Sequence, residues 1–239
     1  MRRFVMFAIC LAASSVARAD FTVSAFDNST IYSNGPRAGT TGQKYFDIES
    51  APNGTYASFG VVDFRATATA GVVSRLSLAL TESNAGFTRP GSLSFYVSTN
   101  TTTNIDAGTS PLTYRTSSSD TTGIGGQLST LYQLGTGIFP GTATGSVDLY
   151  QFAVTGALQS YLTSQVNAGG TIRVVVGAAD AVVDATYAGF TNTTANTPGP
   201  ALTVGTPAAA VPEPASLALL SIGGLAVIGC ARAHRRRLG

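Results

Sequence analysis

Short runs of strand-forming residues, separated by clusters of Gly, Asn, Ser, Thr and Pro, recur along most of this 239-residue chain. Side chains alternate between the two faces of a strand, so Leu93, Phe95 and Val97 share one face of an extended segment. Such runs between turn residues are typical of an all-β sandwich. The expected strands are Phe21–Phe26, Tyr56–Phe64, Val72–Leu80, Ser92–Val97, Leu131–Leu134, Ser146–Val154, Thr171–Val176, Thr186–Phe190 and Ala201–Val204.

One segment has a helical pattern instead. Leu158, Tyr161, Leu162 and Val166 recur at the spacing of one helix face. Thr155 is suited to the N-cap and Gly169 to the stop, so a helix over 156–168 is expected. We therefore predict an all-β fold, a β-sandwich with one short helix that covers an open end. The strand after the helix, with its run of valines, is expected to be buried on both faces.

The N-terminus reads as a secretory signal peptide, residues 1–19. Two arginines precede an apolar run over 4–13, which has about the length of a signal-peptide h-region. Ala17 and Ala19 then form a small-x-small pattern, which predicts cleavage by signal peptidase before Asp20. An uncleaved anchor is the alternative, but the run is short for a span of about 20 residues.

The C-terminus has the pattern of a membrane span. Residues 215–231 carry no charge, and as a helix they would be about 26 Å long, close to the thickness of the hydrocarbon core. The arginines Arg235, Arg236 and Arg237 would stay in the cytoplasm, which leaves the body outside. A buried helix of the domain is disfavoured, because a helix that is apolar on every face needs lipid or a large core around it.

Val211-Pro212-Glu213-Pro214, the apolar segment and the basic end, in this order, resemble the PEP-CTERM sorting signal. The resemblance implies that an exosortase, a membrane protease, cleaves near Pro212, Glu213 and Pro214. It also implies an exported, inner-membrane-tethered precursor and a mature form at the cell surface or in the exopolysaccharide matrix of a Gram-negative-type bacterium. The expected division is a signal peptide, a β-sandwich over 20–206, and a linker with the sorting signal over 207–239, whose motif is 211–214, span 215–231 and basic tail 232–239.

The composition of the body excludes several functions. The chain has a formal net charge of +2, but residues 20–210 hold seven basic and eleven acidic residues, a net charge of −4. A nucleic-acid-binding protein needs a basic stripe, so that partner is excluded. The one histidine, His234, and the two cysteines, Cys10 and Cys230, lie outside the body. Catalysis by a Ser-His-Asp or Cys-His set, a zinc site of these ligands and an internal disulfide are excluded as well.

Two carboxylate pairs are the candidates for chemistry in the body. Asp47 and Glu49 are two apart, so on a strand they would share a face and could flank a glycosidic bond or a calcium ion. We interpret them as a solvated strand face. Asp180 and Asp184 have loop spacing and could supply oxygen ligands to calcium, but they lack EF-hand spacing and Asp is common in turns. We therefore predict no catalytic residues, no metal site and no cofactor.

Sugar-binding surfaces use exposed aromatic rings, and the chain has no Trp. Four tyrosines beside Gly-, Ser- and Thr-rich stretches are the candidates for stacking on a glycan: Tyr32, Tyr45, Tyr114 and Tyr132. The alternative is that each is a half-buried tyrosine whose hydroxyl reaches the surface.

The order of elements in the body resembles DNRLRE-type jelly-roll modules, which are related to carbohydrate-binding domains of exported bacterial proteins. The matching features are the strand Tyr56–Phe64, the helix 156–168 with the strand after it, and the closing segment from Gly189-Phe190 to Pro200-Ala-Leu-Thr-Val204. The signature that names the module is absent. The resemblance implies a jelly-roll-like sandwich that binds sugar.

Taken together, the sequence predicts a non-enzymatic protein of the cell surface or exopolysaccharide matrix. Its expected partners are signal peptidase, exosortase and the membrane during maturation, and then extracellular polysaccharide. The alternative is a carbohydrate-binding module or a carbohydrate-active hydrolase of the cell envelope.

Overall fold

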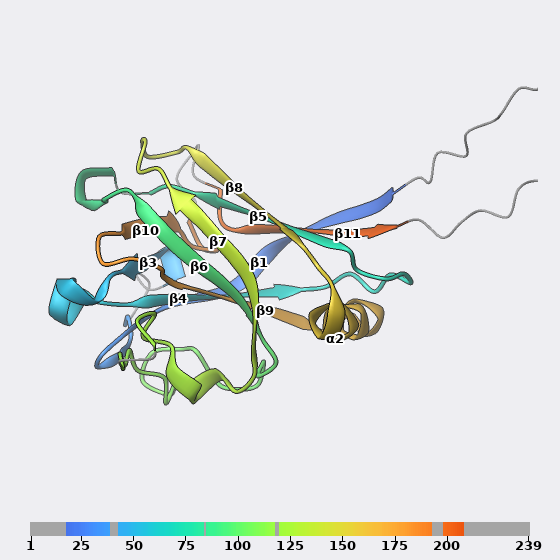
Figure 1. Cartoon of the computed structure of the whole chain (residues 1–239), viewed down its shortest axis with the longest axis horizontal. Helices are drawn as coiled ribbons and strands as arrows, with labels where there is room; N and C mark the ends of the chain where they lie inside the picture. The colour runs from blue at the N-terminus through green and yellow to red at the C-terminus, as the bar shows by residue number, and fades with distance from the viewer. Residues whose placement is uncertain (1–17, 39–42, 84, 118–119, 193–197, 208–239) are drawn as a thin grey trace, which may run out of the picture. The chain divides into compact units, whose positions relative to one another are not determined.

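Eleven strands, one α-helix and three short 3-10 helices form the part of the chain that the computed structural model describes, which is residues 18–38, 43–83, 85–117, 120–192 and 198–207 (Figure 1). The strands are β1 (Arg18–Tyr32), β2 (Gly35–Pro36), β3 (Tyr45–Glu49), β4 (Phe59–Arg65), β5 (Arg75–Thr81), β6 (Gly91–Ser98), β7 (Leu131–Phe139), β8 (Val147–Ala153), β9 (Thr171–Ala178), β10 (Asp184–Ala188) and β11 (Ala201–Pro207). The helices are α2 (Gly156–Ala168), η1 (Ala51–Tyr56), η2 (Ala85–Phe87) and η3 (Gly125–Leu128). All lie within one unit, Arg18–Pro207.

Four antiparallel strand pairs nest inside one another: β6 pairs with β7, β5 with β8, β4 with β9, and β1 with β11. The chain therefore follows the path of one long hairpin, closed at β6–β7 and open at β1 and β11. Further pairing rolls this hairpin into two sheets, ordered β7-β6-β9-β4-β1 and β1-β11-β5-β8. This is the jelly-roll form of a β-sandwich, so the predicted fold class is confirmed.

Strand β1 belongs to both sheets because it is bulged near its middle. Its first half pairs with β11, and its second half pairs with β4. The register shifts between Ala25 and Asp27, which leaves Phe26 as the extra residue. A bulge bends a strand and increases its twist, so β1 can pass from one sheet to the other. The guanidinium of Arg65 lies 5.3 Å from the centre of the Phe26 ring.

The main core fills the space between the sheets, and strict alternation builds it. On β8, Asp148, Tyr150 and Phe152 point inward, whereas Val147 and Leu149 are exposed. Removing apolar surface from water contributes about 25 cal/mol per Å². A shift of one residue in register would therefore expose a whole inner face.

Helix α2 has the bounds that the spacing predicts, and it lies beside the ends of β8 and β9, which it connects (Figure 1). Leu158, Leu162 and Val166 are buried in the main core. Gly169 ends the helix in the left-handed region with a φ of 63°, where a residue without Cβ is favoured. Thr155 occupies the N-cap in an extended conformation, but its side chain makes no capping hydrogen bond.

Strands β4 and β9 are buried on both faces, as the sequence predicts for β9, because the described residues of 99–130 cover the outer face of their sheet. Side chains from that segment pack with β4 and β9 in a second cluster. Arg173 on β9 holds this segment against the sheet. Its guanidinium donates two hydrogen bonds to the Asp63 carboxylate, at 2.8 and 2.7 Å, and one to each of the carbonyls of Asn100 and Thr103, both at 2.9 Å.

Several strand predictions differ from the structure, and β1 in particular continues past Phe26 to Tyr32. The segment that begins at Tyr56 starts as a strand only at Phe59, because Gly54, with a φ of 62°, interrupts an η1 turn before it. Strand β7 continues past Leu134 to Phe139 despite two glycines. Strand β2 was not predicted, since it is only two residues long, and β3 was expected only as a strand face that carries Asp47 and Glu49, without bounds.

Several predictions fall outside the described residues. They concern Ala17, the motif Pro212, Glu213 and Pro214, the span 215–231, and the basic residues Arg235, Arg236 and Arg237. Ala19 and Asp20 fall in β1, opposite Thr206 and Gly205 of β11. Within the described ranges, no helix is both long and apolar enough to cross a membrane.

Candidate functional site

A separate two-stranded sheet, β3 with β10, forms the floor of the candidate site. Phe46 and Ile48 of β3 pack into the main core, and the rings of Phe46 and Tyr187 lie 5.5 Å apart between centroids. The alternate residues of β3, which include Asp47 and Glu49, therefore face away from that core. In the register of the pair, Asp47 lies opposite Thr186 and Glu49 opposite Asp184.

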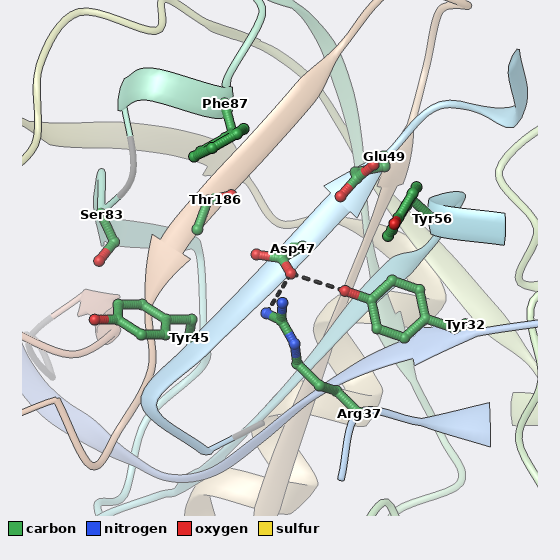
Figure 2. Close-up of a pocket in the computed structure, with 9 residues that line it drawn as sticks. All are labelled: Tyr32, Arg37, Tyr45, Asp47, Glu49, Tyr56, Ser83, Phe87 and Thr186. Atoms are coloured by element: carbon green, nitrogen blue, oxygen red, sulfur yellow. Dashed lines mark hydrogen bonds and ion pairs between the residues drawn. The ribbon is translucent and has the colours of Figure 1, made fainter. Parts of the chain in front are cut away.

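A pocket of ≈ 730 Å³ opens over this small sheet (Figure 2). Its walls come from five further segments: the end of β1, the residue after β2, η1, the residues after β5, and η2. The lining residues are Tyr32, Arg37, Tyr45, Asp47, Glu49, Tyr56, Ser83, Phe87 and Thr186.

Asp47 is held by a fixed set of donors. Its Oδ2 accepts hydrogen bonds from the Tyr32 hydroxyl at 2.9 Å and from Arg37 Nη1 at 2.5 Å, and these are the dashed lines of Figure 2. Its backbone N–H donates to Thr30 Oγ1 at 2.8 Å. Burial, and next the charge of Asp47, raise the pKa of the Tyr32 hydroxyl, so the hydroxyl stays protonated as a donor.

Glu49 is the second carboxylate of the pocket and differs from Asp47. Its pKa is raised to about 7, first by burial and then by the charges of Asp47 and Asp184, while Arg37 opposes the shift. Within the described ranges, no ion pair involves Glu49. The pocket therefore places a carboxylate that is fixed by hydrogen bonds beside one whose pKa is raised to about 7.

Aromatic rings supply the apolar part of the lining. Tyr56 is 67% exposed and Phe87 is 81% exposed, whereas Tyr32 and Tyr45 are half-buried. Lys44 Nζ lies 5.5 Å from the centre of the Tyr45 ring. Flat rings beside fixed polar groups suit a ligand that has both apolar faces and hydroxyl or amino groups.

The structure brings two of the four predicted stacking tyrosines, Tyr32 and Tyr45, into this pocket. Tyr114 is only 8% exposed and packs in the second cluster, with its ring against Gly123, so no face of it is open to a sugar. Tyr132 packs beside Tyr161, with ring centres 5.9 Å apart, and does not line the pocket.

The interpretation of Asp47 and Glu49 as a solvated strand face is wrong for Asp47. That residue is only 3% exposed, because β1, β2 and η1 close over its strand. The shared face of the two carboxylates is confirmed, and the aromatic rings gather around it.

Asp180 and Asp184 do not form a joint site. Asp180 accepts hydrogen bonds from the backbone N–H groups of Ser92, Val182 and Val183, at 2.6, 2.9 and 2.8 Å. Asp184 begins β10 and is bound by Asn53 and Arg89. Among the described residues no group of three or more His, Cys, Asp or Glu side chains is placed to hold a metal ion.

The sequence did not indicate Arg37, Tyr56 or Phe87 as site residues. Arg37 follows the two-residue strand β2, Tyr56 ends the 3-10 helix η1, and Phe87 ends the 3-10 helix η2. Their role depends on which segments the fold brings to β3, and no local pattern carries that information.

Comparison with known proteins identifies the C-terminal segment. Residues 210–237 match the family model of the PEP-CTERM protein-sorting motif. The resemblance based on Pro212, Glu213 and Pro214 is thereby confirmed. The match supports an exported protein whose membrane-anchored precursor is sorted by an exosortase. It covers the tail and not the unit Arg18–Pro207. No match to a curated protein was found.

Proposed function

We propose that the chain is a non-enzymatic protein of the cell surface or the exopolysaccharide matrix, and that the pocket over β3 binds an extracellular glycan. In this proposal, signal peptidase removes residues 1–19 and an exosortase removes the sorting tail. The host would be a bacterium of the Gram-negative type, with the precursor held in its inner membrane.

The observation that carries the proposal is the combination of rings and fixed polar groups in one pocket. Exposed Tyr56 and Phe87 offer flat faces on which a pyranose ring can stack. Asp47 and Arg37 hold each other in place, so their remaining oxygen and N–H groups are pre-organised for sugar hydroxyls. Exposed apolar side chains that gather at one place on a protein surface often mark a binding site.

The test replaces these two rings. With the full chain in mild detergent, we expect Tyr56→Ala and Phe87→Ala each to weaken binding to host exopolysaccharide about tenfold in affinity electrophoresis, since about 1.4 kcal/mol corresponds to a factor of ten. Val147→Ala and Leu149→Ala are the matched controls, because they remove exposed apolar side chains on β8. Equal binding by all four variants and the wild type would refute the proposal.

A hydrolase is the second candidate, and one observation favours it. Glu49 has a pKa raised to about 7 and lies two residues from Asp47, and a carboxyl group of raised pKa close to a second carboxyl group is the arrangement of an acid with its partner. Against it, Asp47 Oδ2 already accepts hydrogen bonds from Tyr32 and Arg37, which hold this carboxylate in a fixed position. Release of reducing ends from the polysaccharide by the wild type, lost in Glu49→Gln, would establish the hydrolase instead.

A further inference from the structure

Glu49 is the carboxylate of this pocket for which the described residues supply neither an ion-pair partner nor a hydrogen-bond donor to its side chain. Asp47 accepts hydrogen bonds from Arg37 and Tyr32. Asp184 lies opposite Glu49. It accepts a hydrogen bond from the Asn53 amide and forms an ion pair with Arg89, whose Nε lies 3.4 Å from Oδ2. Arg37 is the cation that favours ionised Glu49, and it is already bound to Asp47.

The influences that oppose the ionisation of Glu49 outweigh the positive charge of Arg37. Burial and the two neighbouring carboxylates all oppose its ionisation and raise its pKa to about 7. A half-buried anion in such a place gains most from a cation supplied by a ligand, because screening by water is reduced there. A ligand with its own carboxylate would add a further negative charge beside Asp47, Glu49 and Asp184 and would be repelled.

The rings point to the same ligand chemistry. Tyr56, which is 67% exposed, lines the pocket together with Glu49 (Figure 2). The face of an aromatic ring carries negative potential, and it attracts ammonium groups within about 6 Å of its centre. A carboxylate among aromatic rings is thus suited to an amine.

We propose that the glycan bound in this pocket carries free amino groups, as a polymer of 2-amino sugars does, and that Glu49 selects it by pairing with an ammonium group. This inference rests on the proposed glycan binding. Asp47 and Arg37 keep the role of fixed hydrogen-bonding groups for hydroxyls. Glu49 is the residue that determines specificity.

The experiment compares three ligand classes with the full chain in mild detergent, by calorimetry at about pH 5.5, below the ordinary pKa range of an amino group, so that the ligand amines are mainly protonated. The probes are glucosamine oligomers of β-1,4 and β-1,6 linkage, their fully N-acetylated counterparts, and hexuronic acid oligomers. We expect the wild type to bind an amine oligomer about tenfold more tightly than the acetylated one. Binding should also release a proton from Glu49, seen as a dependence of the heat on the ionisation enthalpy of the buffer.

The variant Glu49→Gln keeps the shape of the side chain and removes its charge. We expect it to lower the preference for the amine to less than about threefold, to leave affinity for the acetylated oligomer unchanged, and to abolish proton release. Asp20→Asn is the control, because it removes one negative charge from the exposed start of β1 and should keep the full preference.

The outcomes separate this inference from the proposed function. Binding of acetylated or uronic oligomers as tightly as the amine form would overturn the inference and leave glycan binding standing. An unchanged preference in Glu49→Gln would overturn it too. Failure of every oligomer and of host polysaccharide to bind would overturn both.

Discussion

Glu82 and Asp148 are two buried carboxylates in hydrogen-bond contact, and within the described ranges no ion pair involves either of them. Glu82 Oε1 accepts from the N–H and the hydroxyl of Thr142 at 3.1 and 2.8 Å, while its Oε2 has no donor. Asp148 Oδ2 accepts from the Tyr187 hydroxyl at 3.1 Å. Burial raises the pKa of Asp148 to about 6, with the charge of Glu82 adding to the shift and the Tyr187 hydrogen bond opposing it. A proton on Asp148 therefore satisfies both residues.

This pair predicts a stability that falls as pH rises. The folded pKa lies above the ordinary value of 3.8, so the contribution of Asp148 is complete below about pH 4 and is lost as pH rises through about 6. We expect the free energy of unfolding to fall by about 1–3 kcal/mol from this group. Asp148→Asn should remove that part of the pH dependence, since its amide can donate to Glu82 and accept from Tyr187. Urea denaturation at several pH values measures it, with Asp20→Asn as a control that keeps the wild-type slope. Identical slopes in Asp148→Asn and the wild type would contradict the prediction.

At the scale of elements, β7 depends on a residue without a side chain. A Cβ on Gly137 would lie 2.4 Å from the Tyr150 ring of β8, and 3.2 Å from Phe95 of β6. We expect Gly137→Ala to lower the free energy of unfolding by about 1–3 kcal/mol, because two packed rings must shift. Gly126→Ala is the matched control, since a Cβ there meets nothing within 4 Å. Thermal unfolding compares them, and equal melting temperatures would show that the rings have room to move.

At the scale of the whole molecule, the sorting tail should decide where the chain remains. We expect the two prolines to favour an extended motif, because proline fixes φ and disfavours the helical region for the residue before it. We expect replacement of Pro212, Glu213 and Pro214 by alanines to trap full-length protein in the membrane while export continues. Cell fractionation with mass spectrometry of both chain ends measures this. Processing and release at the wild-type rate would instead show that the tail is a plain anchor.

Local patterns were sufficient for much of the architecture. Alternation located most strands, and the spacing of Leu158, Leu162 and Val166 defined α2, because a strand or helix that buries one face shows its period in the sequence. The sorting signal could be identified for a different reason: it is defined by one continuous stretch of sequence, residues 210–237. The shared face of Asp47 and Glu49 also followed from the period of a strand.

What the sequence by itself determined is therefore whatever depends on neighbours along the chain: the strands, the helix, the sorting tail and the charge of the body. The tertiary structure alone decided the nested pairing, the burial of Asp47 and Tyr114, and the meeting of Arg37, Tyr56 and Phe87 over β3. Those features join residues far apart in sequence, and exposure is set by what packs against a side chain. No periodic pattern records which distant segment that will be.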